Sequence, residues 1–292
     1  MSERYPIIAI TGSSGAGTTS VTRTFENIFR REGVKSVVIE GDSFHRYDRA
    51  EMKVKMAEAE RTGNMNFSHF GPENNLFGDL ENLFRSYAES GTGLRRRYLH
   101  SMEEAAPFGQ EPGTFTEWEP LPADTDLLFY EGLHGGVVTD EVNVAQYPNL
   151  LIGVVPVINL EWIQKLWRDK KQRGYSTEAV TDTILRRMPD YVNYICPQFS
   201  RTHVNFQRVP CVDTSNPFIS REIPAPDESM VVIRFANPKG IDFQYLLSMI
   251  HDSFMSRANT IVVPGGKMEL AMQLIFTPFV LRMMERRKRA AL

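Results

Sequence analysis

Residues 8–20 read IAITGSSGAGTTS, and this stretch decides the fold class. A short apolar strand runs into a glycine-rich turn, and a helix is expected to follow over 18–31. This order of strand, loop and helix is typical of a phosphate-binding loop, or P-loop. Gly12, Gly15 and Gly17 can adopt positive φ, which lets backbone N–H groups approach phosphate oxygens. The stretch therefore predicts a site for a nucleoside triphosphate.

The residues that this loop predicts to bind nucleotide are Gly12, Ser13, Ser14, Gly15, Ala16, Gly17, Thr18, Thr19 and Ser20. Thr19 stands where a hydroxyl normally ligates Mg²⁺. Thr18 stands where a lysine is expected, so another residue must supply the missing positive charge. A glycine-rich turn without a ligand is the structural alternative, but the order of strand, loop and helix favours the phosphate site.

Length and composition limit the classes of protein to which the chain can belong. The chain has 292 residues, 42% of them apolar, which is enough for one large α/β domain or two small ones. Its net charge of −3 gives no reason to expect nucleic acid or a membrane as partner. The two cysteines exclude a disulfide framework and indicate a reducing compartment. The early apolar run is too short for a signal peptide, so we expect a soluble cytoplasmic protein.

The apolar and amphipathic patterns alternate along the chain. Apolar runs predict strands over 5–10, 36–40, 127–130 and 150–158, with weaker ones near 204–209 and 230–235. Helical patterns cover 18–31, 46–61, 75–87, 160–173, 177–188, 240–253 and 267–288. Pro278 is expected to kink the last helix. The alternation predicts an α/β fold with a mostly parallel, mixed central sheet and helices on both faces.

We expect a single P-loop kinase-like domain over residues 1–292 with two added features. Two helices within about 160–190 would form a lid over the nucleotide site. Residues 103–126 are rich in proline and acidic side chains, which indicates a long surface loop.

Asp42 ends the second predicted strand, within the sequence EGDSFH at 40–45. Ligands of open α/β sheets bind at the carboxyl ends of the strands, where the P-loop also lies. A carboxylate there could accept the proton of an attacking hydroxyl, as kinases require. Capping of a turn or of the next helix is the alternative role for Asp42.

Glu131 follows the four apolar residues 127–130 in the same way. One acidic residue after a buried strand is the Walker-B arrangement, which helps to hold Mg²⁺ between the phosphates. Glu131 is therefore predicted as a metal ligand together with Thr19. A solvated glutamate at a strand end is the alternative.

Two basic clusters accompany these carboxylates. His45, Arg46, Arg49 and Lys53 follow Asp42, and the last three share one face of the helix expected over 46–61. This density of cations favours a substrate that already carries phosphate.

The second cluster lies on the predicted lid, where one helical face carries Lys165, Arg168, Asp169, Gln172 and Arg173. Such a stripe is usually a solvated face. Gly174 can end this helix and Ser176 can begin another, so the pair could close over the transferred phosphate. Lys165 or Arg168 would then replace the cation missing at position 18.

Six separated segments resemble the phosphoribulokinases, in the uridine kinase-like branch of the P-loop kinases. They are GSSGAGTT at 12–19, EGDSFH at 40–45, FSHFGPENN at 67–75, RRRYLH at 95–100, YEGLH at 130–134, and KLWRD with RG at 165–169 and 173–174. The resemblance implies ATP- and Mg²⁺-dependent phosphorylation of the C1 hydroxyl of D-ribulose 5-phosphate. The product would be ribulose 1,5-bisphosphate, which the Calvin cycle uses to fix carbon dioxide.

The resemblance also assigns roles. Asp42 would be the general base, Glu131 the Walker-B acid and Asp169 a further catalytic carboxylate in the lid. Catalytic cations would be Lys165 and Arg168. The residues expected to bind the sugar phosphate are His45, Arg49, Lys53, Tyr98, His100 and Arg173.

Two departures indicate the subtype. Plant-type relatives carry a cysteine and a lysine where this chain has Ala16 and Thr18. The chain therefore resembles the bacterial class, for which NADH as activator, AMP as inhibitor and a homo-oligomer, often an octamer, are implied. Arg187, Arg234 and Arg257 are candidates for effector binding or subunit contacts, and ordinary surface ion pairs are the alternative.

Two other functions stay open from sequence. A uridine or pantothenate kinase would differ mainly in its substrate pocket. A nucleotide-binding regulator without turnover would explain Thr18, although Asp42, Glu131 and Asp169 count against it.

Overall fold

The computed structural model describes residues 1–13, 18–220 and 222–291. The predicted loop residues Ser14, Gly15, Ala16 and Gly17 lie outside the described residues. The same holds for the side chains of Thr18, Thr19, Gln172 and Arg173.

The described residues form a mixed sheet of eight strands in the order β2-β5-β1-β6-β7-β8-β10-β9. Five of the strands are parallel: β2 (Ser36–Glu40), β5 (Leu127–Gly132), β1 (Ile7–Thr11), β6 (Leu150–Val155) and β7 (Val204–Pro210). Three antiparallel strands follow: β8 (Ser229–Phe235), β10 (Thr260–Pro264) and β9 (Phe254–Arg257). The predicted mostly parallel, mixed sheet is confirmed.

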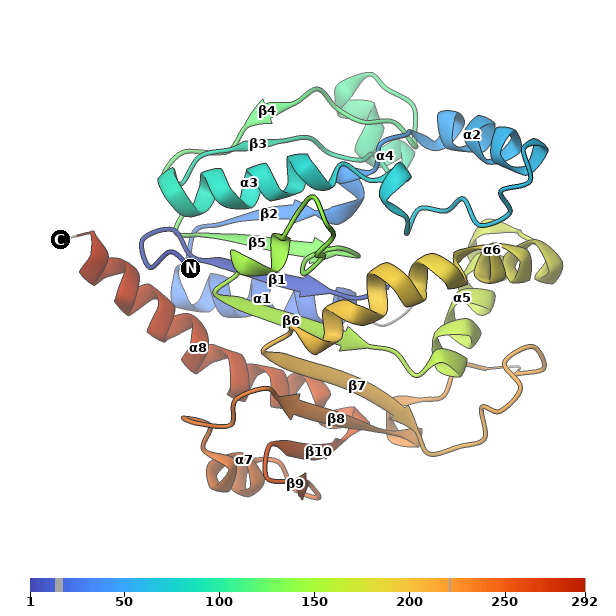
Figure 1. Ribbon diagram of the computed structural model, residues 1–292. Coiled ribbons are helices and arrows are strands. Elements are labelled where there is room, and N and C mark those ends of the chain that lie inside the picture. The colour runs from blue at the N-terminus through green and yellow to red at the C-terminus, as the bar shows by residue number, and fades with distance from the viewer. Residues whose placement is uncertain (14–17, 221, 292) are drawn as a thin grey trace.

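Helices cover both faces of the sheet (Figure 1). Alternate residues of β1 point to opposite sides, as the period of a strand requires. Ile8 and Ile10 pack with α1 (Thr18–Glu32) and α8 (Met268–Ala290), whereas Ile7 and Ala9 pack with α3 (Phe77–Ser90). The two apolar cores hold the carboxyl ends of β1, β2 and β5 at one edge.

Aromatic rings fill the core beneath α1 and α8. The ring of Phe25 lies 4.7 Å from that of Phe276 and 5.2 Å from that of Phe129, measured between centroids. Helix α8 continues through Pro278. It begins after the hairpin of β9 and β10, whose strands were not predicted as such. α7 (Phe243–Met249) is shorter than the helix expected over 240–253.

Helix α2 (Arg49–Arg61) begins three residues later than expected. Asp48 caps it, because its side chain accepts a hydrogen bond from the Glu51 backbone N–H. The Glu51 carboxylate in turn accepts a hydrogen bond from the Asp48 backbone N–H. Arg46 therefore lies outside the helix, and its guanidinium donates to the Glu73 carbonyl oxygen at 3.0 Å. The expectation that Arg46 shares a helical face with Arg49 was wrong, because the sequence pattern gave no weight to this cap.

The two expected lid helices are present beyond the carboxyl end of β6, as α5 (Ile158–Arg173) and α6 (Thr177–Asp190) (Figure 1). Gly174 ends α5 with φ 71°, and Ser176 caps α6 by accepting from the Ala179 N–H. Pro189 lacks an N–H donor, and the chain then changes into a π-helical turn over Tyr191–Ile195.

The segment expected as a long loop over 103–126 contains short elements. They are α4 (Met102–Ala105) and β4 (Glu119–Pro120), which pairs with β3 (Leu94–Arg95). The Arg96 guanidinium lies over the ring of Phe115 at 3.7 Å and over that of Trp118 at 4.9 Å. Within the described parts of the chain, no helix is long and apolar enough to cross a membrane.

Candidate active site

The carboxyl ends of β1, β2 and β5 bring the first loop glycine and two predicted carboxylates to one edge of the sheet. In the strand register, Glu131 of β5 lies beside Glu40 of β2 and beside Ile10 of β1. The Gly12 N–H donates to the Gly132 carbonyl oxygen at 3.2 Å. Asp42 follows β2 in a 3-10 turn over Gly41–Phe44.

Two glycines allow this close approach. A Cβ on Gly41 would lie 2.8 Å from the Gly132 Cα and 2.6 Å from the Tyr130 hydroxyl oxygen. Contacts that short require the backbone to shift, so larger residues at Gly41 or Gly132 would push the turn that carries Asp42 away from the end of β5.

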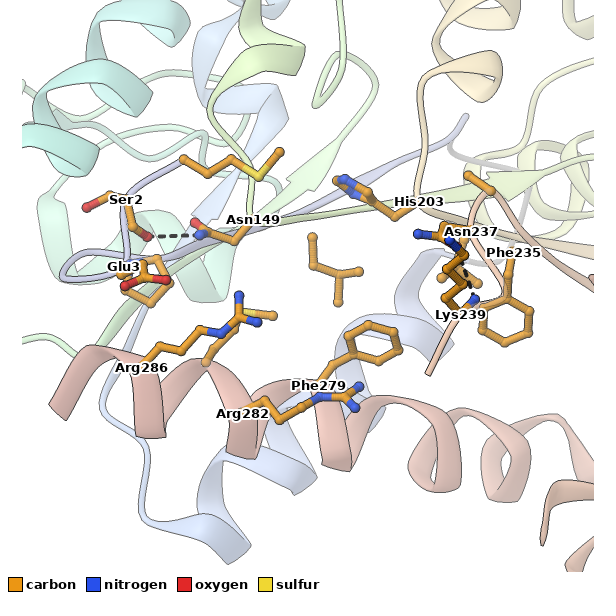
Figure 2. Close-up of a pocket in the computed structure, with 16 residues that line it drawn as sticks. Ser2, Glu3, Asn149, His203, Phe235, Asn237, Lys239, Phe279, Arg282 and Arg286 are labelled. Atoms are coloured by element: carbon orange, nitrogen blue, oxygen red, sulfur yellow. Dashed lines mark hydrogen bonds between the residues drawn. The ribbon is translucent and has the colours of Figure 1, made fainter. Parts of the chain in front are cut away.

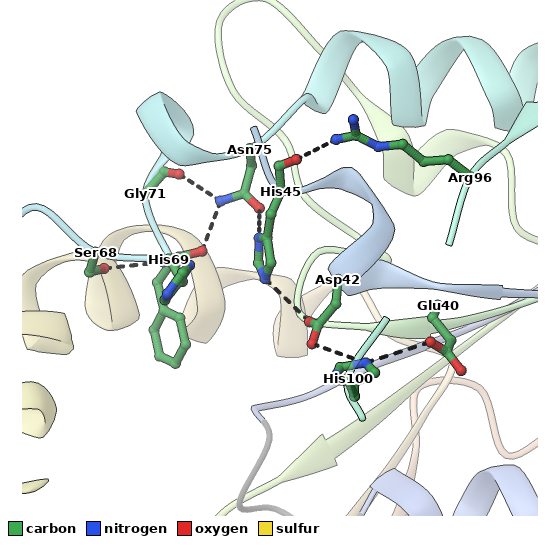
Figure 3. Close-up of polar contacts among 10 residues, drawn as sticks. Glu40, Asp42, His45, Ser68, His69, Gly71, Asn75, Arg96 and His100 are labelled. Atoms are coloured by element: carbon green, nitrogen blue, oxygen red, sulfur yellow. Dashed lines mark hydrogen bonds and ion pairs between the residues drawn. The ribbon is translucent and has the colours of Figure 1, made fainter. Parts of the chain in front are cut away.

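Asp42 lies among histidines (Figure 3). Its Oδ1 is 3.3 Å from His45 Nε2, and its Oδ2 is 3.9 Å from His100 Nε2. The Asp42 side chain is 42% exposed, so one edge stays open to a substrate. Burial by itself would raise the pKa of Asp42, but the His45 hydrogen bond and the histidine charges hold that pKa well below its ordinary value. Asp42 is therefore a carboxylate at neutral pH.

The other histidines near Asp42 differ in their surroundings. Burial lowers the pKa of His69 to about 3, and burial lowers the pKa of His134 to about 3 as well. Both rings are therefore neutral at physiological pH. The pKa of His100 is raised, chiefly by its hydrogen bond to Glu40.

The lid contributes a buried ion pair. Lys165 Nζ lies 2.6 Å from Asp169 Oδ2, and Arg168 Nε lies 3.1 Å from Asp169 Oδ1. Burial and the charge of Arg187 lower the pKa of Lys165 to about 8, although Asp169 opposes this shift. Burial would raise the pKa of Asp169, but the bond and charge of Lys165 outweigh it and lower that pKa.

Arg187 lies with this cluster, although the sequence suggested an effector or subunit role for it. Its guanidinium is 5.0 Å from the centre of the Phe70 ring. Burial lowers the pKa of Arg187 to about 10, against the charges of Asp169, Glu161 and Asp42. The arginine is thus within electrostatic reach of both Asp42 and the lid carboxylate.

Glu161 was not predicted, yet it joins the lid to the P-loop. Its carboxyl group accepts hydrogen bonds from the Ser13 hydroxyl and, at 3.3 Å, from the Tyr191 hydroxyl. Burial raises the pKa of Glu161 against the effect of these bonds. The signal that could have found it is helical spacing, because Glu161 lies one turn before Lys165 on the same helix.

Gln198 was also missed, because nothing in its local sequence marks it. The side chain is fully buried, and its Oε1 accepts from the Thr11 hydroxyl at 2.8 Å and from the Gly136 N–H at 2.9 Å. Its Nε2 donates to the carbonyl oxygens of Leu133 and Tyr194. Gln198 thus ties the end of β1 to the loop after β5.

Two of the predicted substrate residues, His45 and His100, lie against the Asp42 carboxylate. The Tyr98 and His100 rings meet edge to face at 4.8 Å between centroids, and Arg49 donates to the His100 carbonyl oxygen at 3.3 Å. Lys53 is exposed on α2, and Ser20 is exposed on α1. The side chain of Arg173 lies outside the described residues.

Of the two residues predicted to hold Mg²⁺, Glu131 is described, and the side chain of Thr19 lies outside the described residues. Among the described residues, no group of three or more His, Cys, Asp or Glu side chains could hold a metal ion. Kinases need no such cluster, because phosphate oxygens, one hydroxyl and one acidic residue provide the ligands. Glu131 is half-buried at the end of β5, next to the strand that enters the P-loop.

Two other hollows lie apart from Asp42. A cavity of about 500 Å³ at the opposite edge of the sheet is lined by the N-terminal segment, His203, Arg282 and Arg286, and no predicted residue borders it (Figure 2). A second cavity of about 540 Å³ lies over β7, β8 and β9 and is lined by both Arg234 and Arg257.

The fold and site together define a P-loop kinase. A P-loop strand, an acidic residue after its neighbouring strand and a cationic helical lid are the parts that nucleoside triphosphate-dependent phosphoryl transfer uses.

Comparison with known proteins narrows this class. The family model described as Phosphoribulokinase / Uridine kinase family matches residues 7–215. The chain is 98% identical over 292 residues to a plasmid-encoded phosphoribulokinase of Cupriavidus necator, and the match covers 100% of both chains. It is 71% identical to the phosphoribulokinase of Nitrobacter vulgaris, across 99% of this chain and 100% of the relative. The chain belongs to the phosphoribulokinase / uridine kinase family.

A solved structure agrees with this assignment. The phosphoribulokinase from Rhodobacter spheroides superposes with a TM-score of 0.91 at 59% identity, covering 98% of this chain and 100% of that one. The likeness extends through the antiparallel strands β8, β9 and β10, which lie beyond the region that the family model matches.

Proposed function

We propose that this protein transfers the γ-phosphoryl group of ATP to the C1 hydroxyl of D-ribulose 5-phosphate, which gives ribulose 1,5-bisphosphate for the Calvin cycle. The full-length likeness to proteins named phosphoribulokinase carries this proposal. The Asp42 carboxylate, at the same edge of the sheet as the P-loop strand, supports it chemically. Because the relatives are bacterial, we assign the protein to the bacterial cytoplasm.

Asp42 acts as the base that takes the proton of the acceptor hydroxyl. Backbone N–H groups of residues 13–18 bind the phosphates at the start of α1. Lys165, Arg168 and Arg173 neutralise the charge that spreads over the transferred phosphoryl oxygens, and Lys165 replaces the lysine missing at position 18. Thr19 and Glu131 would hold Mg²⁺, which would supply positive charge against the phosphates.

The lid and the loop near His100 complete the substrate pocket. His45, Arg49 and His100 contact the sugar phosphate, together with Lys53, Tyr98 and Arg173. Asp169 keeps Lys165 and Arg168 in place through the ion pairs of 2.6 and 3.1 Å. We assign residues 160–190 as a lid that closes over bound nucleotide, within one kinase domain spanning the chain.

We place the regulatory site apart from Asp42. NADH activates and AMP inhibits by binding near Arg234 and Arg257, whose side chains border one cavity. We propose that the protein works as a homo-oligomer, with the octamer as the candidate form. Arg187, which lies within reach of Asp42, is the candidate that would transmit an effector signal to catalysis.

Asp42→Asn tests the catalytic assignment. The amide cannot accept the hydroxyl proton, so kcat should fall by about 10²–10⁴-fold while ATP binding stays nearly unchanged. Turnover is followed as ADP release, and ATP binding by calorimetry. A change confined to the KM for the sugar phosphate would show that Asp42 is not the base.

A panel of acceptors separates the remaining functions. Ribulose 5-phosphate should give the highest kcat/KM among sugar phosphates, uridine and pantothenate. Preference for uridine or pantothenate would favour the other branch of the family. Absence of acceptor-dependent ADP release with every compound would indicate a nucleotide-binding regulator.

A further inference from the structure

The segment at 67–75 runs beside the Asp42 turn, although no catalytic role was assigned to it. Residues His45 and Asn75 form an antiparallel bridge. The Arg46 N–H donates to the Asn74 carbonyl oxygen at 2.8 Å, and the Leu76 N–H donates to the Phe44 carbonyl oxygen at 2.8 Å. The backbone on both sides of Asn75 is therefore fixed against the backbone that carries His45.

The orientation of the Asn75 amide follows from its partners (Figure 3). Its Nδ2 lies 2.9 Å from the His69 carbonyl oxygen and 2.7 Å from the Gly71 carbonyl oxygen. Both partners are acceptors, so the atom facing them must be the NH₂ group. The Asn75 side chain is only 3% exposed, which leaves its Oδ1 on the other side as an acceptor.

This acceptor determines which nitrogen of His45 carries hydrogen. The Asn75 Oδ1 lies 3.0 Å from His45 Nδ1, and a carbonyl oxygen can only accept. Nδ1 must therefore be protonated. When the ring is charged, Nε2–H donates to Asp42 Oδ1, 3.3 Å away, and lowers the pKa of Asp42. When the ring is neutral, Nε2 carries a lone pair at the same position and can accept a proton.

We propose that Asn75 is a positioning residue that holds His45 as the Nδ1–H tautomer, so that Nε2 receives the proton that Asp42 takes from the acceptor hydroxyl. The proposal rests on the kinase function proposed above. It gives His45 a part in proton transfer in addition to its predicted contact with the sugar phosphate.

The reaction conserves the proton and the electron pairs. The acceptor oxygen forms a bond to the γ-phosphorus while the bond from phosphorus to the ADP oxygen breaks, and ADP keeps that electron pair. The hydroxyl O–H bond breaks and its proton passes to Asp42 Oδ1. The proton then moves to His45 Nε2, which makes an imidazolium and restores the Asp42 carboxylate. The imidazolium releases the proton to water when the products leave.

The groups around His45 allow this step. The ring of His69 lies 5.0 Å from that of His45, and the pKa values of about 3 for His69 and His134 leave both rings uncharged. His100 approaches the other oxygen of Asp42.

Cations act on this pair from two other elements. Arg96 donates to the His45 carbonyl oxygen at 2.6 Å, away from the ring nitrogens. From the lid, Lys165 and Arg187 act electrostatically on the neighbouring His69.

Asn74 provides a matched control, because it is equally buried in the same turn but has a different partner. Its exposure is 1%, and its amide donates to the Ser68 carbonyl oxygen. Loss of either side chain should loosen the turn. Only loss of Asn75 should alter the protonation of His45.

The test compares the pH dependence of kcat in Asn75→Ala, Asn74→Ala and the unaltered protein. Asn75→Ala should lower kcat by about 10–100-fold. It should also move the acidic limb of the pH profile of kcat to lower pH, because the His45 imidazolium loses the Asn75 oxygen that accepts from Nδ1–H. Asn74→Ala should lower thermal stability without moving that limb. Equal pH profiles for the two variants, or an unchanged kcat in Asn75→Ala, would overturn the proposal.

Neutron diffraction on the unaltered protein at alkaline pH tests the tautomer without any variant. Deuterium on His45 Nδ1 and none on Nε2 is the expected result, and deuterium on Nε2 alone would overturn the proposal. This readout does not depend on turnover. Failure of the unaltered protein to phosphorylate ribulose 5-phosphate would instead reject the proposed function.

Discussion

At the scale of single residues, Lys165 shows how burial sets the charge of a group that we propose to act in catalysis. Its ammonium is 10% exposed and paired with Asp169, yet its pKa falls from 10.5 to about 8. Between these two values the unfolded chain binds the proton more tightly than the folded chain. The contribution of Lys165 to the free energy of unfolding therefore increases as the pH rises from about 8 to 10.5. Over the same range the charged fraction of Lys165 in the folded protein declines.

Lys165→Arg tests this consequence. In the unaltered protein, kcat/KM should fall as pH rises through about 8, because neutral Lys165 cannot stabilise phosphate charge. Arginine stays charged, so the fall should move to higher pH even if the maximum rate is lower. Lys170→Arg, at an exposed position of the same helix, should leave the profile unchanged. An identical fall near pH 8 in Lys165→Arg would assign it to another group.

Glu161→Gln tests the buried carboxyl group that meets Ser13. Folding raises the pKa of Glu161 above 4.5, so ionisation disfavours the folded state as pH rises through that value. Glutamine keeps an acceptor for the Ser13 hydroxyl without the charge. The melting temperature of Glu161→Gln relative to the unaltered protein should therefore increase from pH 4 towards pH 7. A difference that is constant with pH would mean that Glu161 does not ionise with a raised pKa.

At the scale of elements, the lid depends on a small apolar contact between its two helices. Leu166 of α5 packs against Val180 and Ile184 of α6. The π-helical turn after α6 places Tyr191 against Glu161, which joins the lid to the P-loop through Ser13. The position of the lid cations thus depends on packing at both ends of α6.

Ile184→Ala should weaken this contact, because it leaves a cavity at a residue that is 4% exposed. We expect a loss of about 2–5 kcal/mol in the free energy of unfolding of the lid, measured by hydrogen exchange of α5 and α6. Its neighbour Leu185 is 53% exposed, and Leu185→Ala should change stability by less than about 0.5 kcal/mol. Similar exchange rates in both variants would show that the contact does not hold the lid.

At the scale of the whole molecule, the order of strands assembles the site. β5 lies between β1 and β2, so the P-loop, Glu131 and Asp42 reach the same edge although more than a hundred residues separate the first from the second. Gln198 then ties β1 to the loop after β5 from a segment far along the chain. The antiparallel strands β8, β10 and β9 extend the sheet away from Asp42 and carry Arg234 and Arg257.

The sequence by itself determined the strand and the helix that flank the predicted P-loop, the parallel strands, the two helices α5 and α6, and the position of Asp42 and Glu131 at strand ends. These features depend on local chemistry: glycine conformation, apolar periodicity and helix caps act between residues near in sequence. The start of α2 was missed because the Asp48 cap outweighed the local pattern. The hairpin of β9 and β10 was missed because pairing of β10 with the neighbouring strand β8 outweighed the local pattern.

Only the tertiary structure decided how the charged groups are partnered. Ser13 donates a hydrogen bond to Glu161, and Asn75 hydrogen-bonds to His45. Arg187 lies within electrostatic reach of Asp42. The distance along the chain between the members of each pair does not indicate these contacts. Such contacts join residues brought together by the packing of separate elements. Burial then sets the pKa of Lys165 and Glu161, because desolvation depends on neighbours that the linear sequence does not identify.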